Sequence, residues 1–278
     1  MQVNRVSQPR PVADIRVECI FDDERLKKQI KSACRRNLPA VSPMPETSGT
    51  AVLCGSGPSL RDSIEDVRRH VDKGDFVIAV KGAHDYLINR GVIPTAGLAI
   101  DPQPKIFHTF TPNKAVKYYF ASQVHPSVFN KFNGYDVNIF HLYTNIPSEE
   151  MATLIGDGFL LGGGSTSGLR AMTLAFVMGY RKFHLYGFDS CMSDGIRKIT
   201  GEGQQHKKLV NVHVGAPDSQ EVYVADAAMA AQADEFEKML HFLYQMAPIH
   251  VTTHGKGLIQ AIAKHRSSQG CTYVAHED

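Results

Sequence analysis

Short apolar strands alternate with amphipathic helices along most of the chain, and this alternation constrains the fold more than any other feature of the sequence. It starts at Ala51–Cys54 and continues to a closing helix at Gly257–His265. Such alternation is typical of a parallel sheet with helices on both faces. We predict an α/β protein, a Rossmann-like, doubly wound, mainly parallel sheet in a single domain over residues 50–278. The predicted strands are Ala51–Cys54, Phe76–Val80, Ala96–Ile100, Tyr118–Ser122, Val137–Tyr143, Lys182–Tyr186 and Ile249–Thr253, with shorter ones at Leu209–Val214 and Glu221–Val224.

Residues 1–49 are predicted to form an N-terminal extension of this domain. Asp22–Arg36 has apolar residues at helical spacing and a basic far side, and prolines at 39, 43 and 45 interrupt the chain after it. The helix either packs on the main domain as an accessory element or serves as a partner-binding arm. Its basic side leaves room for a nucleic-acid acceptor.

The composition is that of an ordinary globular protein, with 43% hydrophobic and 21% charged residues. A net charge of +2 is too small to indicate nucleic-acid binding, and the basic clusters Lys27–Arg36 and Arg197–Lys208 are more typical of solvated faces. The five cysteines contain no C-x-x-C pair, which favours reduced thiols in a cytoplasmic protein without structural zinc. We expect no membrane span and no signal peptide. A homo-oligomer is compatible with the sequence.

A glycine-rich loop, Gly55-Ser56-Gly57-Pro58-Ser59, follows the first strand and leads into an amphipathic helix predicted over Ser59–Val71. The glycines permit a tight turn and a close approach of backbone to a ligand, and proline suits a first helical position because its missing N–H is not needed there. A plain strand-to-helix turn would have a similar composition. The third glycine of the dinucleotide motif is replaced by Leu60, so we do not expect NAD.

A second loop rich in glycine and hydroxyl residues precedes the apolar helical run Leu169–Val177. Backbone N–H groups at a helix start, together with Ser and Thr hydroxyls, form a ready site for an anion. The candidate ligand-binding residues of this loop are Gly163, Gly164, Ser165, Thr166, Ser167 and Gly168.

Three charged residues follow predicted strands. Lys81 follows the second strand, Asp101 the third, and Asp189 the strand Lys182–Tyr186. Each alone is more often structural, but the carboxyl ends of parallel strands share one edge, where α/β sheets bind ligands. Together with the two loops they predict a nucleotide or phosphate pocket. Lys81 would neutralise phosphate charge, and Asp101 and Asp189 would hold a ribose or Mg²⁺.

The polar segment Ser190–Lys208 is long for a connection, and we predict that it is a lid or an acceptor-binding loop. It contains His206, the candidate acid/base or phosphate contact. His125 is a second candidate because it precedes a predicted helix start. A lone histidine is more often a surface residue or a hydrogen-bonded core residue.

The order and spacing of four motifs resemble the MptE-like family, which is named for archaeal 6-hydroxymethylpterin diphosphokinase and includes motility-associated bacterial proteins and phage-borne members. The resemblance spans about Thr50 to Thr253 and implies a Rossmann-like fold. The motifs that carry it are Gly55–Leu60, Ala79–Ala83, Asp101-Pro102, and Gly164–Leu169 with Gly179-Tyr180 and Tyr186–Asp189.

The first and last motifs also resemble the CMP-sialic acid transferases of bacterial lipooligosaccharide synthesis, whose corresponding segments bind the nucleotide. This resemblance implies nucleotide binding by Gly55, Ser56, Gly57, Pro58 and Ser59, and by Ser165, Thr166, Ser167 and Gly168. Ser56 replaces an asparagine of that pattern, and the histidine base of those enzymes has no clear match in Glu221–Asp226. His206 lies nearer to where MptE-like members often carry a histidine. The resemblance therefore implies nucleotide use rather than sialyl transfer.

The sequence predicts a nucleotide-dependent transferase with a CMP- or UDP-type nucleotide-sugar donor and a small-molecule or glycan acceptor. Asp101 or Asp189 would orient ribose, metal or acceptor, and His206 would act as general base. One alternative is an ATP-dependent diphosphokinase for a small hydroxymethyl-type acceptor, with Mg²⁺ held by Asp101 and Asp189. The other is a non-catalytic nucleotide-binding protein that keeps the fold without the base.

Overall fold

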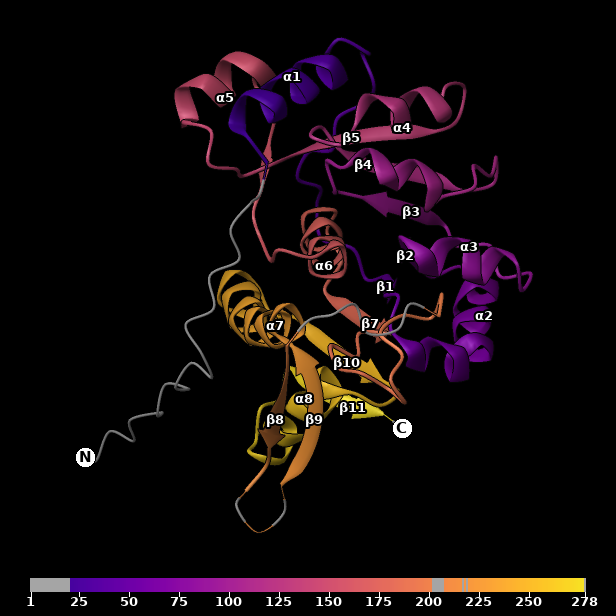
Figure 1. The fold of residues 1–278 in the computed structure, drawn as a ribbon, viewed down its shortest axis with the longest axis vertical. Coiled ribbons are helices and arrows are strands. Elements are labelled where there is room, and N and C mark those ends of the chain that lie inside the picture. The colour runs from indigo at the N-terminus through magenta and orange to yellow at the C-terminus, as the bar shows by residue number, and fades with distance from the viewer. Residues whose placement is uncertain (1–20, 202–207, 217, 219, 278) are drawn as a thin grey trace.

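A nine-stranded parallel sheet forms the centre of the protein, in the order β11-β10-β7-β1-β2-β3-β4-β5-β6 (Figure 1). The computed structural model describes residues 21–201, 208–216, 218 and 220–277. The predicted doubly wound α/β fold is confirmed. The strands are β1 Thr50–Cys54, β2 Phe76–Val80, β3 Ala96–Ala99, β4 Lys117–Ala121, β5 Val137–Leu142, β6 Leu160–Leu161, β7 Lys182–Tyr186, β10 His250–His254 and β11 Val274–Glu277. A separate antiparallel pair consists of β8 Leu209–Val214 and β9 Glu221–Asp226.

Helices cover both faces of the sheet because successive side chains of each strand point to opposite sides. In β1, Ala51 and Leu53 belong to one buried apolar cluster, whereas Val52 and Cys54 belong to another. The α-helices are α1 Asp23–Cys34, α2 Ile64–Lys73, α3 Gly82–Ile88, α4 Pro126–Lys131, α5 Ser148–Ile155, α6 Ser167–Val177, α7 Ala227–Met246 and α8 Leu258–Ser268, and the 3₁₀ helices are η1 Pro58–Ser63 and η2 Pro104–His108. In the described part of the chain, no helix has the length and apolar character needed to cross a membrane.

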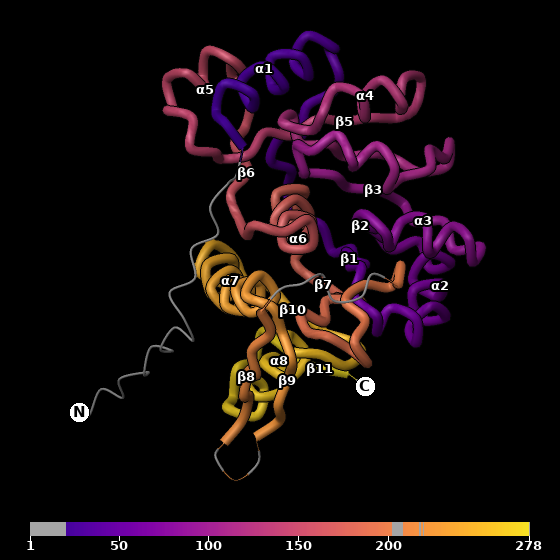
Figure 2. The backbone as a smooth tube through the Cα atoms, in the orientation of Figure 1, coloured from indigo at the N-terminus to yellow at the C-terminus, as the bar shows by residue number. Residues whose placement is uncertain are grey.

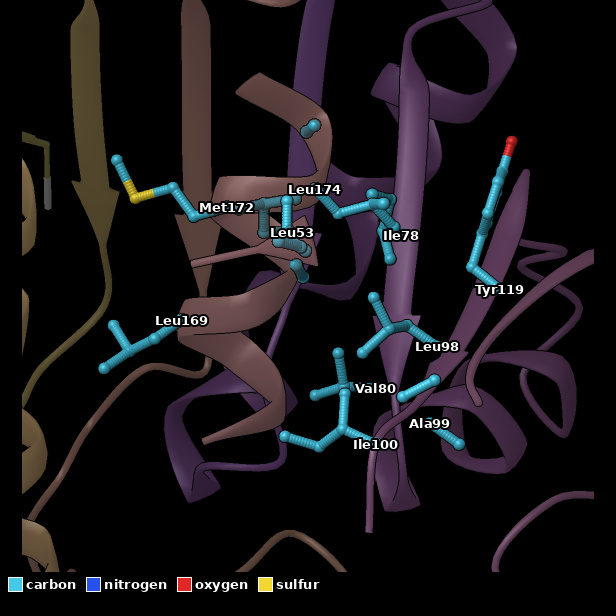
Figure 3. Close-up of a cluster of buried hydrophobic side chains, with 14 of the residues drawn as sticks. Leu53, Ile78, Val80, Leu98, Ala99, Ile100, Tyr119, Leu169, Met172 and Leu174 are labelled. Atoms are coloured by element: carbon cyan, nitrogen blue, oxygen red, sulfur yellow. The ribbon is translucent and has the colours of Figure 1, made fainter. Parts of the chain in front are cut away.

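Helix α6 packs on the middle of the sheet, against β1, β2 and β3. Its apolar side chains Leu169, Met172 and Leu174 share a cluster with residues of these strands (Figure 3). The opposite face carries α2 and α3, both in contact with β2. Burial on both faces explains why the strands read as short continuous apolar runs in the sequence.

The strand order reverses between β1 and β7. From β1 the chain adds strands outward to β6, and it then returns to place β7 on the other side of β1. This is the topological switch point of the sheet, where loops after two adjacent strands diverge and α/β proteins bind their ligands.

The segment before β1 is joined to the domain at two places. Helix α1 packs against α5 with Leu26 and Ile30 in a small buried cluster, beside the β5–β6 end of the sheet (Figures 1 and 2). Residues 39–41 then pair in parallel with β5, where Val41 N donates to Ile139 O at 2.8 Å. Of the two predicted alternatives for this helix, the structure shows the accessory element packed on the domain.

Several elements differ from the sequence prediction, including the short edge strand β6 and the 3₁₀ helix η2, which it does not contain. The predicted helix Ser59–Val71 is divided into η1 and α2, which meet at Ser63 and Ile64. A short edge strand, β11, follows the closing helix and pairs with β10. Four residues at an edge give too little periodicity to distinguish a strand from a loop.

Candidate functional site

The loop after β1 lies directly against the loop after β7. Gly55 N donates to Tyr186 O at 2.7 Å, and Gly57 N donates to Gly187 O at 2.8 Å. A Cβ atom at Gly57 would lie 2.6 Å from Gly187 O, which is shorter than any normal contact. The glycines are therefore required by contact between two backbones, in addition to any approach of a ligand.

A cavity of about 540 Å³ opens at this edge of the sheet. Its volume lies within the range of small-molecule sites, which is about 300–1,000 Å³. The sequence-predicted residues that line it are Gly55, Ser56, Gly57, Lys81, Asp101, Thr166, Ser167, Gly168 and Asp189. The structure thus brings both glycine loops and the three charged residues to one cavity.

Five other candidate residues do not line this cavity. Pro58 and Ser59 begin η1, where they are buried. Ser165 faces α7, since its N and Oγ donate to Glu235 Oε2 at 2.9 and 2.8 Å. Gly163 and Gly164 pack against side chains of α6, because added Cβ atoms would each lie 2.4 Å from Thr173 or Leu169. These residues shape the loops, and Thr166, Ser167 and Gly168 present the start of α6 to the cavity.

Two buried hydroxyl groups at the cavity have no hydrogen-bond partner among the described residues, namely Ser167 Oγ and Ser190 Oγ. Ser167 is the first residue of α6, and Thr166 caps this helix by accepting from Leu169 N at 3.4 Å. Ser190 has a positive φ of 51°. An unpaired buried hydroxyl costs about 1–3 kcal/mol, a cost that a polar ligand or an ordered water at the cavity would remove.

Four basic side chains line the cavity: Lys81, Lys105, Arg197 and Lys198. Burial lowers the pKa of Lys81, and the nearby charges of Lys198 and Lys105 lower it further, while Asp101 opposes this. Lys81 Nζ lies 3.5 Å from Asp101 Oδ2, and Arg197 Nη2 lies 3.2 Å from Asp226 Oδ2. This concentration of positive charge suits a phosphate or diphosphate group.

Sequence reasoning identified only Lys81 among these four cations. Arg197 and Lys198 belong to a basic cluster whose composition is typical of a solvated face, and Lys105 lies on η2 without any motif. The segment with Arg197 and Lys198 reaches the cavity because it folds over the first glycine loop, where Ile199 N donates to Ser56 O at 2.8 Å. The position of this basic cluster shortly after Asp189, at the end of a strand, is the sequence feature that could have indicated its place at the cavity.

The backbone of Lys81 is strained, with φ 46° and ψ −124°. A non-glycine residue in such a conformation costs about 1–3 kcal/mol and is held by its surroundings. Lys81 is the cap residue before α3, directly after β2, and Ser56 Oγ donates to the neighbouring Val80 O at 3.2 Å. The strain directs a cationic side chain to the cavity and is typical of functional sites.

The two predicted metal-binding carboxylates differ in their surroundings. Asp189 is 2% exposed, Ser59 N donates to its Oδ2 at 2.8 Å, and Ser59 Oγ donates to its Oδ1. Burial raises the pKa of Asp189 to about 6, against the opposing effect of these hydrogen bonds. Asp101 is partly exposed, and its Oδ1 accepts from Gln103 N at 3.0 Å. Asp101 is therefore the carboxylate more available to a ligand.

No histidine lines the cavity among the described residues. His206 lies outside the described residues. His125 caps α4, with its Nδ1 2.8 Å from Ser127 Oγ. His84 is buried, 2.6 Å from Asp85 Oδ1 and 3.2 Å from the Tyr118 hydroxyl. The described residues therefore do not identify a general base.

Comparisons with known proteins agree with this architecture. A family model described as 6-hydroxymethylpterin diphosphokinase MptE-like matches residues 24–195, a range that includes nearly all of α1, both glycine loops, Asp101 and Asp189. The MAf glycosyltransferase from Magnetospirillum magneticum AMB-1 has a similar structure, with a TM-score of 0.60 and 17% sequence identity. That similarity covers 82% of this chain but 36% of the other, so this chain spans about a third of that protein. No curated protein matches the sequence.

Proposed function

Because the chain belongs to the MptE-like family, as its motifs predicted, we propose that it binds a nucleotide at the β1–β7 switch point and transfers a group from it. The observation that carries this proposal is the composition of one cavity. Four basic side chains, the start of α6 and two unpaired hydroxyls converge there. Helix-terminal amides and cations are the groups that proteins use to hold phosphate.

We favour a nucleotide-sugar donor of the CMP or UDP type and a small-molecule or glycan acceptor. In glycosyl transfer the departing nucleotide gains negative charge, which the basic side chains and the α6 amides would stabilise. With both oxygens of Asp189 bonded to Ser59, the cations of the cavity rather than a carboxylate-bound metal would balance the phosphate charge. The fold shared with a glycosyltransferase is consistent with this donor. His206 stays the predicted base for the acceptor.

An ATP-dependent diphosphokinase is the second candidate, and the family description favours it. Mg²⁺ commonly binds through one or two carboxylates together with substrate phosphates. Asp101 fits this role, because it faces the cavity and is partly exposed. Asp189 fits it less well, because binding a metal would require it to give up Ser59. When bound, Mg²⁺ would neutralise phosphate charge during transfer.

A panel of nucleotides, tested by thermal melting with and without Mg²⁺, distinguishes these candidates. We expect CMP or UDP to raise Tm without metal, and a ligand at 100 times its Kd adds about 2.7 kcal/mol. Stabilisation by ATP only with Mg²⁺ would support the diphosphokinase. Binding of a nucleotide sugar without turnover, unchanged by His206→Ala, would support a non-catalytic binding protein. Absence of stabilisation by every nucleotide would overturn the proposal.

Ser167→Ala should separate ligand binding from stability. Without ligand, we expect the free energy of unfolding to stay equal or rise slightly, because the removed hydroxyl has no partner. We expect nucleotide affinity to fall about tenfold to a hundredfold, since a hydrogen bond to a charged group contributes roughly 1.5–3 kcal/mol. Urea denaturation and a binding titration measure the two quantities.

Ser122→Ala is the matched control for this variant. Ser122 is also a buried serine, but its Oγ lies 3.0 Å from His141 Nδ1 and it does not line the cavity. We expect the opposite result, a loss of about 1 kcal/mol in stability with unchanged nucleotide affinity. Equal affinities of Ser167→Ala and the unaltered protein would place the phosphate elsewhere.

A further inference from the structure

A cluster of histidines lies on the other half of the sheet, outside the proposed nucleotide cavity. His184 of β7, His254 of β10 and Glu277 of β11 stand on three adjacent parallel strands. One ring nitrogen of each histidine and one carboxylate oxygen lie within 4.8 Å of one another. None of the three residues lines the nucleotide cavity, and the nucleotide proposal makes no use of them.

The strand register brings these side chains together. His254 is the direct partner of Glu277, and Thr252, two residues before His254, is the partner of His184. Residues two apart on a strand share a face of the sheet, so His254 projects from the same face as His184. Their nitrogens approach to 2.8 Å, between His184 Nδ1 and His254 Nε2, and His254 Nδ1 lies 3.7 Å from Glu277 Oε2.

Neighbouring side chains fix the orientation of the two imidazoles. The ring of Tyr186 stacks on His254 with centroids 4.2 Å apart, and the two histidine rings stack on each other at 5.0 Å. On the other side, the ring centroids of His70 and His184 are 4.8 Å apart, and His70 Nδ1 lies 2.7 Å from Asp75 Oδ2. Such supports hold ligand side chains in place in metal sites.

The cluster is open to solvent on one side. His254 is 7% exposed, whereas the side chain of Glu277 is 63% exposed. Burial of the two rings disfavours their charged forms and so lowers the pKa of His184 and of His254. A hydrogen bond between the imidazoles accounts for the contact of the two histidines, but it assigns no role to the carboxylate beside them.

We propose that His184, His254 and Glu277 bind a divalent transition-metal ion of the zinc class. Two imidazoles and one carboxylate form a recognised zinc ligand set, and a fourth position would be open to water. Ligand atoms around tetrahedral zinc are about 3.3 Å apart, given bonds of about 2.0–2.1 Å. One ion can take only one ring nitrogen of His254, so binding at Nε2 would open the 2.8 Å contact with His184 by about half an ångström. The exposed Glu277 side chain, now 3.7 Å from His254 Nδ1, would turn toward the Nε2 side. The ion would tie the edge strand β11 to β10 and β7.

Titration of the chelator-treated full chain with Zn²⁺, followed by calorimetry, tests this site. We expect one tight site that raises Tm, and we expect Co²⁺ in its place to give the visible absorption bands of a tetrahedral ion. Glu277→Gln should weaken Zn²⁺ binding at least about tenfold without affecting the fold, because this side chain is exposed. His184→Gln and His254→Gln should abolish binding.

His250→Gln is the matched control, because His250 is an exposed histidine on the same strand β10 and is not one of the proposed ligands. Its Zn²⁺ affinity should equal that of the unaltered protein. Two results would overturn the proposal. One is the absence of binding at Zn²⁺ concentrations up to about 100 μM. The other is a Zn²⁺ affinity of the Glu277 and histidine variants equal to that of the unaltered protein. If a histidine variant fails to fold, Glu277→Gln alone tests the site. Weaker Zn²⁺ binding by Glu277→Gln supports this site, whereas unchanged binding indicates a different one, such as cysteine thiols.

Discussion

Gly57→Ala is expected to lower the free energy of unfolding by about 3 kcal/mol or more and to abolish nucleotide binding. The added Cβ would lie 2.6 Å from Gly187 O and 2.7 Å from Asp189 Cγ. Neither atom can move easily, because Gly187 O accepts from Gly57 N and the Asp189 carboxyl is bonded to Ser59. Relief of the clash requires the loops after β1 and β7 to separate, which disrupts the cavity between them. Urea denaturation and nucleotide titration measure both effects.

Gly162→Ala is the matched control, since Gly162 belongs to the second glycine loop and has room for a methyl group. Its added Cβ would lie 4.0 Å from the nearest atom, Tyr143 Cδ2, and its φ is not positive. We expect a change within about 1 kcal/mol, including the usual gain from a stiffer unfolded chain. If Gly57→Ala were as mild as Gly162→Ala, close packing of the two strand-end loops could not be the reason for the glycines.

The fold was predictable from the sequence because its determinants are local. Short apolar runs such as Phe76–Val80 predict strands, and the spacing of apolar residues between these runs predicts helices. The sequence did not reveal that Pro39 O accepts from Ile139 N at 2.8 Å, since proline interrupts a strand pattern. The division between η1 and α2 was missed for a different reason. It accompanies hydrogen bonds from Ser59 to Asp189, 130 residues later in the chain.

Part of the candidate site was predictable for the same reason. Residues that directly follow strands, such as Lys81 and Asp101, must lie at the carboxyl edge of a parallel sheet. Lys105 and Lys198 reach the cavity only because longer segments fold back over it, and no local pattern encodes such a path. Ser165 was predicted to bind the ligand but faces α7 instead, because the position of a loop does not determine the direction of each of its side chains. Their functional roles remain predictions.

Asp189→Ala is expected to lower the free energy of unfolding by about 3 kcal/mol near pH 4, where the folded carboxyl carries its proton. It leaves Ser59 N and Oγ without an acceptor in a buried position and creates a void beneath η1. Asp189→Asn is the matched variant, because the amide has nearly the same shape and its oxygen can accept from Ser59 N. We expect Asp189→Asn to retain most of the stability that Asp189→Ala loses, as measured by urea denaturation.

The pH dependence of these proteins tests whether the carboxyl of Asp189 is held in an environment that favours its proton. Burial raises its folded-state pKa to about 6 from an ordinary value of 3.8, so the folded protein binds the proton more tightly than the unfolded chain. The stabilisation is complete below about pH 4 and is lost as the pH rises through 6. The difference between these pKa values corresponds to about 3 kcal/mol. Because Asp189→Asn cannot lose this proton, its stability relative to the unaltered protein should rise by about this amount between pH 4 and pH 8. A stability difference that does not change with pH would contradict the raised pKa of Asp189.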